Sequence, residues 1–271
     1  MKKRKLSVKH PNTENQDKQI YFLCAMPRSG NTLFASIMNQ NPDLVVTPNS
    51  ITLEIMKDLF LLKKTDVFQN FPDEQSLNNV MDEVYNLYYK YWPFKTIVDR
   101  GPVCTPGNLK VMQKHFKQPI RCIVLVRDLL DVLASYIKWF ETEPTSFLNK
   151  YKTIEDKLNN IMNKEGAVAK ELMSIQYLLH HPEMAVFIKY DDLVENPERE
   201  IRKVYTFLNL PYYPHYFTNL EQIIINGISY DDGIVGKNMH TIRTEKVMKV
   251  DNYYKNMIPE RFIKEYGHIT F

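Results

Sequence analysis

The sequence lacks the short motifs that mark several large enzyme classes. It contains no HExxH zinc helix, no paired CxxC, no GxSxG nucleophile turn and no GxGxxG dinucleotide loop. A zinc enzyme, a serine hydrolase and a Rossmann dehydrogenase are therefore unsupported. We expect no metal site.

A strong excess of one charge is also missing. The chain has 35 Lys and Arg against 32 Asp and Glu, a formal net charge of +3. Nucleic-acid-binding proteins show a much stronger basic bias, so we expect no nucleic-acid partner. Only the start, Met1–Lys9, is strongly basic, and a polar stretch follows it. We expect residues 1–19 to form a disordered tail.

Long apolar runs and abundant cysteines are absent as well. No stretch has the length needed to span a membrane, and no signal-peptide core follows the basic start. Cys24, Cys104 and Cys122 form no CxxC pair, and the chain has no Asn-x-Ser/Thr sequon. An odd number of cysteines, two of them in apolar runs, predicts reduced core thiols and a cytoplasmic protein.

What the sequence does contain is an alternation of short apolar runs with amphipathic stretches. We predict strands over 20–25, 96–99, 120–126 and 185–189, and helices over 31–39, 77–91, 129–139, 154–179 and 197–208. Strands separated by such helices favour an α/β fold with a parallel sheet covered on both faces. Ligands bind such sheets at the carboxyl ends of the strands. Without a repeat or linker, residues 20–271 are predicted to be one domain.

The first predicted strand runs into the sequence MPRSGNTL, a tight turn that opens a helix. Backbone N–H groups at a helix N-terminus attract anions, and Gly30 permits a close approach of the backbone. Arg28 adds a fork suited to phosphate or sulfate. A Walker A loop would carry lysine where this chain has Asn31, which argues against a nucleotide triphosphatase. An ordinary strand–turn–helix is the alternative. The expected anion-binding residues are Arg28, Ser29, Gly30, Asn31, Thr32 and Leu33.

A second candidate anion site follows the most apolar strand. Arg127 lies where that strand ends, and Ser135 follows eight residues later in the next helix. Both side chains can donate to a phosphate. The alternatives are a salt bridge from Arg127 to a nearby aspartate and a backbone hydrogen bond from Ser135. Together with the first loop, the pair predicts a two-point anion clamp.

These segments carry a family resemblance. MPRSGNTLF and LVRDLLDVLASYIKW resemble the 5′-phosphosulfate and 3′-phosphate segments of sulfotransferases that use 3′-phosphoadenosine-5′-phosphosulfate (PAPS). The PRSG loop is most similar to protein-tyrosine and bacterial or viral members. A third segment, FIKYDDLVENP, resembles the element whose tyrosine, here Tyr190, approaches the nucleotide. The resemblance covers about 20–210 and implies a P-loop-like three-layer α/β sandwich without a metal.

The resemblance also implies an activity. A sulfuryl group would pass from PAPS to an acceptor hydroxyl, releasing adenosine 3′,5′-bisphosphate (PAP), with Arg28 and Arg100 stabilising the transferred group. Sulfotransferases close this site with a late glycine- and lysine-containing segment, and the counterpart here contains Lys237 and Arg243. An ordinary surface loop is the alternative for that segment.

The general base departs from the family pattern. The histidine of cytosolic members falls at Pro102, and the glutamate of protein-tyrosine members falls at Asn49. Glu54 and Asp99 are the candidate carboxylates that remain. The acceptor stays open among a saccharide, a lipid, a small phenol and a peptide tyrosine. The alternative functions are a P-loop kinase or NTPase and a non-catalytic PAP(S)-binding module.

Overall fold

The structure is a computed structural model that describes residues 18–143, 147–221, 224–228 and 252–271. Its strands are β1 Gln19–Ala25, β2 Leu44–Val46, β3 Thr96–Arg100, β4 Cys122–Val126 and β5 Ala185–Lys189. The α-helices are α1 Asn31–Met38, α2 Thr52–Leu62, α3 Asp66–Asn70, α4 Glu74–Tyr89, α5 Pro106–His115, α6 Leu129–Thr142, α7 Ile154–Met162, α8 Ala167–Leu179, α9 Tyr190–Glu195, α10 Pro197–Leu208 and α11 Glu260–Tyr266. Short 3₁₀ turns are η1 Phe147–Lys150, η2 Pro182–Met184 and η3 Asn252–Met257.

The strands form a five-stranded sheet in the order β2-β3-β1-β4-β5, and every pairing is parallel. β1 lies at the centre and is buried along nearly its whole length. A parallel sheet brings the carboxyl ends of its strands to one edge. The loop after β1 therefore lies between the ends of β3 and β4.

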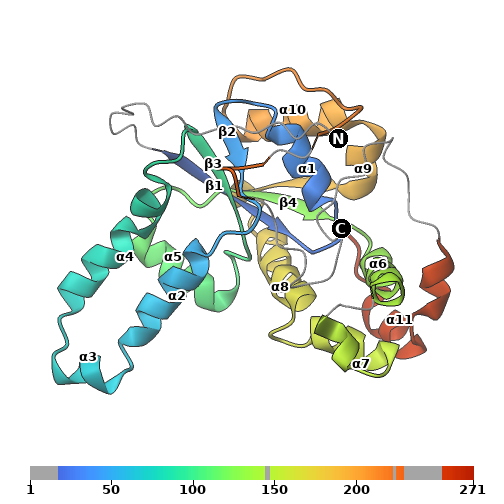
Figure 1. The fold of residues 1–271 in the computed structure, drawn as a ribbon, viewed down its shortest axis with the longest axis horizontal. Helices are drawn as coiled ribbons and strands as arrows, with labels where there is room; N and C mark the ends of the chain where they lie inside the picture. Colours follow the sequence, from blue (N-terminus) through green and yellow to red (C-terminus); the bar gives the residue numbers. More distant parts are fainter. Residues whose placement is uncertain (1–17, 144–146, 222–223, 229–251) are drawn as a thin grey trace.

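Two separate cores cover the two faces of the sheet. Along β1, Phe22 and Cys24 pack into one core with α2, α4, α5, α6, α7 and α8, whereas Leu23 and Ala25 pack into the other with α1, α9 and α10. This alternation follows from the period of two in a strand. Figure 1 shows the three layers, with α1, α9 and α10 on one side and α2–α4 extending from the other. The predicted three-layer α/β sandwich is confirmed.

The predicted long helix over 154–179 is wrong, because the chain turns between α7 and α8. A Cβ atom on Gly166 would lie 2.3 Å from the Ile161 carbonyl oxygen, so this turn leaves no room for a side chain. The predicted apolar face of α4 is also wider than the real one. Val80 and Tyr91 are 52% and 68% exposed, while Val84 and Tyr85 are buried.

The domain begins slightly earlier than predicted. Gln19 already belongs to β1, and the Lys18 ammonium donates to the carbonyls of Trp92 and Phe94 at 2.6 and 2.8 Å. Residues 1–17 lie outside the described residues. None of the described helices is long and apolar enough to cross a membrane.

Candidate functional site

The loop between β1 and α1 has an unusual backbone. Arg28 has φ of 70° and Gly30 has φ of 94°, both in the left-handed region. Glycine is required at the second position for an added reason, because a Cβ atom on Gly30 would lie 2.8 Å from Cδ2 of Tyr190. The loop therefore packs directly against the start of α9, the element that the sequence predicted to approach a nucleotide.

Side chains within the loop hold its shape. Ser29 Oγ donates to the Met26 carbonyl at 2.6 Å, and Asn31 Nδ2 donates to the same oxygen at 3.2 Å. Both side chains are buried, with Ser29 fully so. Ser29 was predicted to bind the anion, but its hydroxyl group donates its proton to a carbonyl within the loop. Thr32 and Leu33 lie half-buried in the first turn of α1, where backbone N–H groups have no helical partner.

The two predicted anion sites are joined by hydrogen bonds. Arg28 Nε donates to Ser135 Oγ in α6 at 3.0 Å, and Arg127 Nη1 donates to the Arg28 carbonyl at 2.9 Å. Because the Ser135 oxygen accepts from Arg28, its own proton stays available to a ligand. Neither predicted alternative for Ser135 and Arg127, a backbone bond or a salt bridge, accounts for these contacts.

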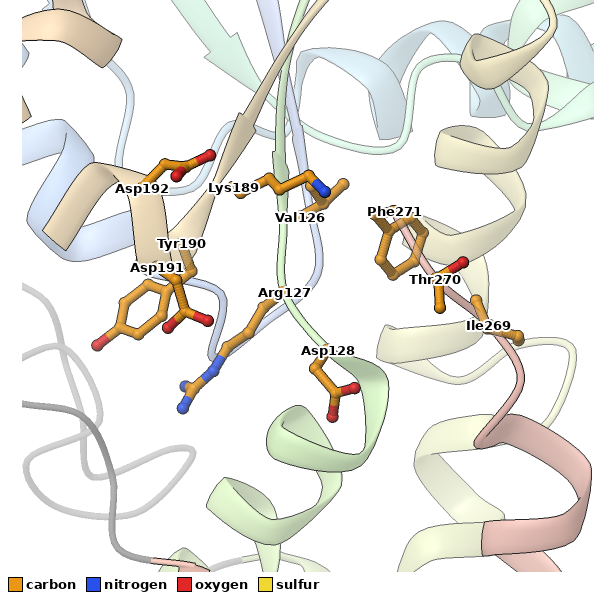
Figure 2. A pocket seen from close by; sticks show the side chains of 10 residues that line it. All are labelled: Val126, Arg127, Asp128, Lys189, Tyr190, Asp191, Asp192, Ile269, Thr270 and Phe271. Carbon is orange, nitrogen blue, oxygen red and sulfur yellow. The ribbon is translucent and has the colours of Figure 1, made fainter. Parts of the chain in front are cut away.

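Arg127 also packs on Tyr190. Its guanidinium carbon lies 4.4 Å from the centre of the Tyr190 ring, and its Nε is buried without a hydrogen-bond partner among the described residues. A buried donor without a partner is costly, and an anion could satisfy it. Figure 2 shows Arg127 and Tyr190 side by side, with Phe271 across from them.

A pocket of about 230 Å³ adjoins this cluster at the carboxyl ends of β4 and β5. The sequence did not predict that the segment after α11 would line it. No local pattern in that segment marks it as part of a site. The pocket is lined by Val126, Arg127, Asp128, Lys189, Tyr190, Asp191, Asp192, Ile269, Thr270 and Phe271.

Arg100 ends β3 at the same edge. Its backbone N–H donates to Thr47 Oγ1 at 2.9 Å, and its Nη1 donates to the Pro48 carbonyl at 3.2 Å. Burial raises the pKa of Tyr136 to about 12, and the positive charges of Arg28 and Arg100 both oppose that rise. The two arginines therefore act on one side chain of α6, and the cluster gathers cations from the ends of β1, β3 and β4.

The carboxylate of the candidate base Asp99 is buried and held by three hydroxyl groups. It is 2% exposed, and its carboxylate accepts from Thr47, Thr52 and Tyr89 hydroxyls at 3.3, 2.5 and 2.7 Å. Burial raises its pKa, while the hydrogen bonds from Thr52 and Tyr89 oppose the rise. These bonds tie Thr47, the first residue of α2 and the last residue of α4 to β3, so Asp99 holds these segments in position.

The remaining predicted residues divide into two groups. Glu54 lies on an exposed position of α2. Lys237 and Arg243 lie outside the described residues.

Sequence reasoning missed Glu171 of α8, a carboxylate that is 8% exposed at the same edge of the sheet. The available signal was a charged residue at a core-facing position of a helix, one turn from Val168 and Ile175.

Comparisons with known proteins identify the family of this chain. The sulfotransferase domain family matches residues 18–232. The chain belongs to this family. A solved structure, the sulfotransferase domain from the curacin biosynthetic pathway, has a TM-score of 0.51 and 19% identity, covering 94% of this chain and 93% of that one. That likeness shows the shared α/β fold with a five-stranded parallel sheet.

Two other sulfotransferase structures align less closely. The domain from the Synechococcus PCC 7002 olefin synthase has a TM-score of 0.47 and 16% identity over 97% of this chain and 91% of that one. Mouse sulfotransferase SULT7A1, solved in complex with PAP, has a TM-score of 0.46 and 14% identity over 74% and 61%. No curated protein sequence matches the chain.

Proposed function

We propose that this sulfotransferase moves a sulfuryl group from PAPS to an acceptor hydroxyl and releases PAP. The observation that carries the proposal is the pair of hydrogen bonds that join Arg28 to Ser135 and Arg127 to the Arg28 carbonyl. The bonds hold two anion-binding groups in fixed relative positions. PAPS carries two such anionic groups, a 3′-phosphate and a 5′-phosphosulfate.

In this proposal, a different set of residues binds each of the two anionic groups. The loop amides, Thr32 and Arg28 face the 5′-phosphosulfate, and Ser135 and Arg127 donate to the 3′-phosphate. The ring of Tyr190 covers Arg127 and limits its movement. The unpartnered Nε of Arg127 supports a site built for a ligand.

The site accelerates transfer by stabilising the negative charge that develops in the transition state. In-line transfer places new negative charge on the leaving and equatorial oxygens, and fixed cations lower the barrier because they need no reorganisation. Arg28 and Arg100 supply those cations. Lys237 and Arg243 extend the proposal as residues that close over the nucleotide. We place the chain nearest the members with an arginine-containing PRSG loop.

The test is turnover of sulfur-labelled PAPS with a panel of saccharide, lipid, phenol and tyrosine-peptide acceptors. The wild-type protein should release PAP and label at least one acceptor class. Arg28→Ala should impair transfer by about 10²-fold or more, as removal of one oxyanion-stabilising donor does. Equal transfer by Arg28→Ala would contradict the role of the loop. PAP binding with no turnover of PAPS would instead favour a binding module.

A further inference from the structure

Glu171 is a buried carboxyl on α8, near the edge of the sheet where the proposed sulfuryl site lies. The chain leaves α8 at its C-terminal end and enters β5 through η2, so the N-terminal half of α8 lies at the carboxyl edge of the sheet. Ser174 fixes the position of the helix, since its Oγ accepts from Cys104 N at 3.0 Å and lies 3.6 Å from Cys24 Sγ. Glu171 is one turn nearer the edge than Ser174.

The groups that act on the Glu171 carboxyl belong to β1 and β3, the strands that lead into the proposed sulfuryl site. The groups that act on its carboxyl are Cys24 and the backbone amide of Ala25 in β1, and Arg100 at the end of β3. The negative charge of Glu171 also acts on the thiol of Cys104, after β3, where it opposes the lowering of the thiol pKa by hydrogen bonds from Cys122 and Cys24. Ala25 immediately precedes the anion-binding loop, and Arg100 is the second cation of the site. The carboxyl therefore interacts both with the strand that leads into the loop and with that cation.

Among the candidate carboxylates, Glu171 keeps one buried oxygen without a partner. Its Oε2 is buried without a hydrogen-bond partner among the described residues. Asp99 differs, because three hydroxyls satisfy it, and Glu54 differs, because it is exposed. A buried carboxylate oxygen without a partner is costly, so its presence near a binding site points to a ligand group that donates to it.

We propose that Glu171 is the general base that accepts the proton of the acceptor hydroxyl. This assignment rests on the proposed function. The acceptor oxygen forms a bond to sulfur, and the bond between sulfur and the bridging oxygen of the 5′-phosphate breaks. The electron pair leaves with PAP, and the acceptor proton passes to Glu171, which later releases it to solvent. No oxidant, reductant or metal takes part.

Burial makes this carboxyl a stronger base than an exposed one. It raises the pKa of Glu171 well above its usual range, Cys24 adds to the rise, and Arg100 and the Ala25 amide oppose it. A general base works best when its pKa lies near the working pH. Because only the carboxylate accepts a proton, the transfer rate should increase with pH as Glu171 ionises.

The experiment measures PAPS turnover with water as the acceptor, since water is always present and the preferred acceptor is unidentified. It compares wild type, Glu171→Gln, Glu171→Asp and the control Glu165→Gln. Glu165 is exposed before α8 and pairs with Lys170 at 2.9 Å. PAP affinity is measured by calorimetry on every variant, and thermal unfolding confirms that each is folded.

Glu171→Gln should lower kcat by about 10²- to 10⁴-fold, the usual contribution of a general base. Its rate should lose the rise with pH, whereas Glu171→Asp should keep that rise at a lower kcat. PAP affinity should stay the same or tighten, because the substitution removes a negative charge near a phosphate. Glu165→Gln should behave as wild type.

Two results would overturn the proposal, and they are distinguishable. Full kcat with an unchanged pH profile in a folded Glu171→Gln protein removes Glu171 as the base and leaves the proposed function standing. Failure of the wild-type protein to bind PAP, or to turn over PAPS with water and with every acceptor of the panel, removes the proposed function, and the assignment of Glu171 with it.

Discussion

Arg28 Nε lies 3.0 Å from Ser135 Oγ, a hydrogen bond between residues 107 positions apart in the sequence. The bond joins the loop after β1 to the second turn of α6. It fixes the distance between the two places where the sequence predicted anions to bind. We expect these residues to act together, so their substitutions should not be additive.

A double-mutant cycle tests that expectation. Arg28→Ala and Ser135→Ala should each weaken PAP binding, Arg28→Ala the more strongly because it removes a charge. A hydrogen bond with a charged partner contributes about 1.5–3 kcal/mol, and residues in one network couple by about 0.5–3 kcal/mol. Calorimetry of the two single variants and the double variant measures the coupling. Strict additivity would show that the bond has no role in binding.

Arg127→Ala should reduce PAP affinity by about ten- to a hundredfold, because a charge-assisted bond to phosphate is lost. The matched control is Arg121→Ala, at the opposite end of β4. Arg121 also packs on an aromatic ring, with its guanidinium carbon 4.6 Å from the centre of Phe207. The control should bind PAP as wild type does. Equal losses in both variants would point to a general effect of charge or stability.

Gly30→Ala should destabilise the fold and impair PAP binding for two reasons. The left-handed backbone costs a non-glycine residue about 1–2 kcal/mol, and the new Cβ meets Tyr190 at 2.8 Å. Gly227→Ala separates the two effects, because Gly227 has φ of 74° but nothing within 4 Å of its added Cβ. Chemical unfolding should show the larger loss for Gly30→Ala. A loss no larger than that of Gly227→Ala would mean that the loop moves away from Tyr190.

Glu171 should make stability depend on pH in a specific direction. Its pKa in the folded state is raised above the unfolded value, so the folded state holds the proton more tightly. Below the unfolded pKa both states are protonated, and Glu171→Gln should change little. Above the folded pKa the buried charge destabilises the wild type by about 1.4 kcal/mol for each unit of the shift.

Glu171→Gln should therefore show a melting temperature that exceeds the wild type by an amount that grows with pH. Differential scanning calorimetry across the acid-to-alkaline range measures this difference. The control Glu165→Gln should show no such trend, because Glu165 is exposed. A difference that is constant with pH, or that shrinks as pH rises, would contradict a buried, poorly solvated carboxyl at this position.

Local sequence patterns predicted most of the strands and helices, and they marked several of the residues that lie together at the candidate site. Arg28, Arg127 and Tyr190 follow apolar strands, and a parallel sheet brings such positions to one edge whatever the rest of the chain does. Sequence spacing could not show that Ser29 would donate within its own loop or that Asp99 would meet three hydroxyls. The Ser29 contact depends on the backbone shape of its loop, and the Asp99 contacts depend on the packing of α2 and α4 against β3.

Glu171 shows why the base could not be predicted. The apolar spacing of Val168, Leu172 and Ile175 was read as a face of one long helix, and the acidic residue within that face marked a buried charge without indicating a role for it. The proposed role of Glu171 depends on its electrostatic interaction with Arg100. That interaction arises only because α8 packs on the sheet, since several helices and strands separate the two residues in the chain. Long-range packing of this kind is not encoded in local periodicity.

The most direct measurement is a calorimetric titration of the purified protein with PAP, compared with ATP and Mg²⁺. We expect tight binding of PAP and weak binding of Mg-ATP, because Asn31 replaces the Walker lysine and the clamp of Arg28, Ser135 and Arg127 suits a nucleotide with phosphates at both positions. A clear preference for Mg-ATP, or no binding of PAP, would contradict this expectation and favour a P-loop kinase or NTPase.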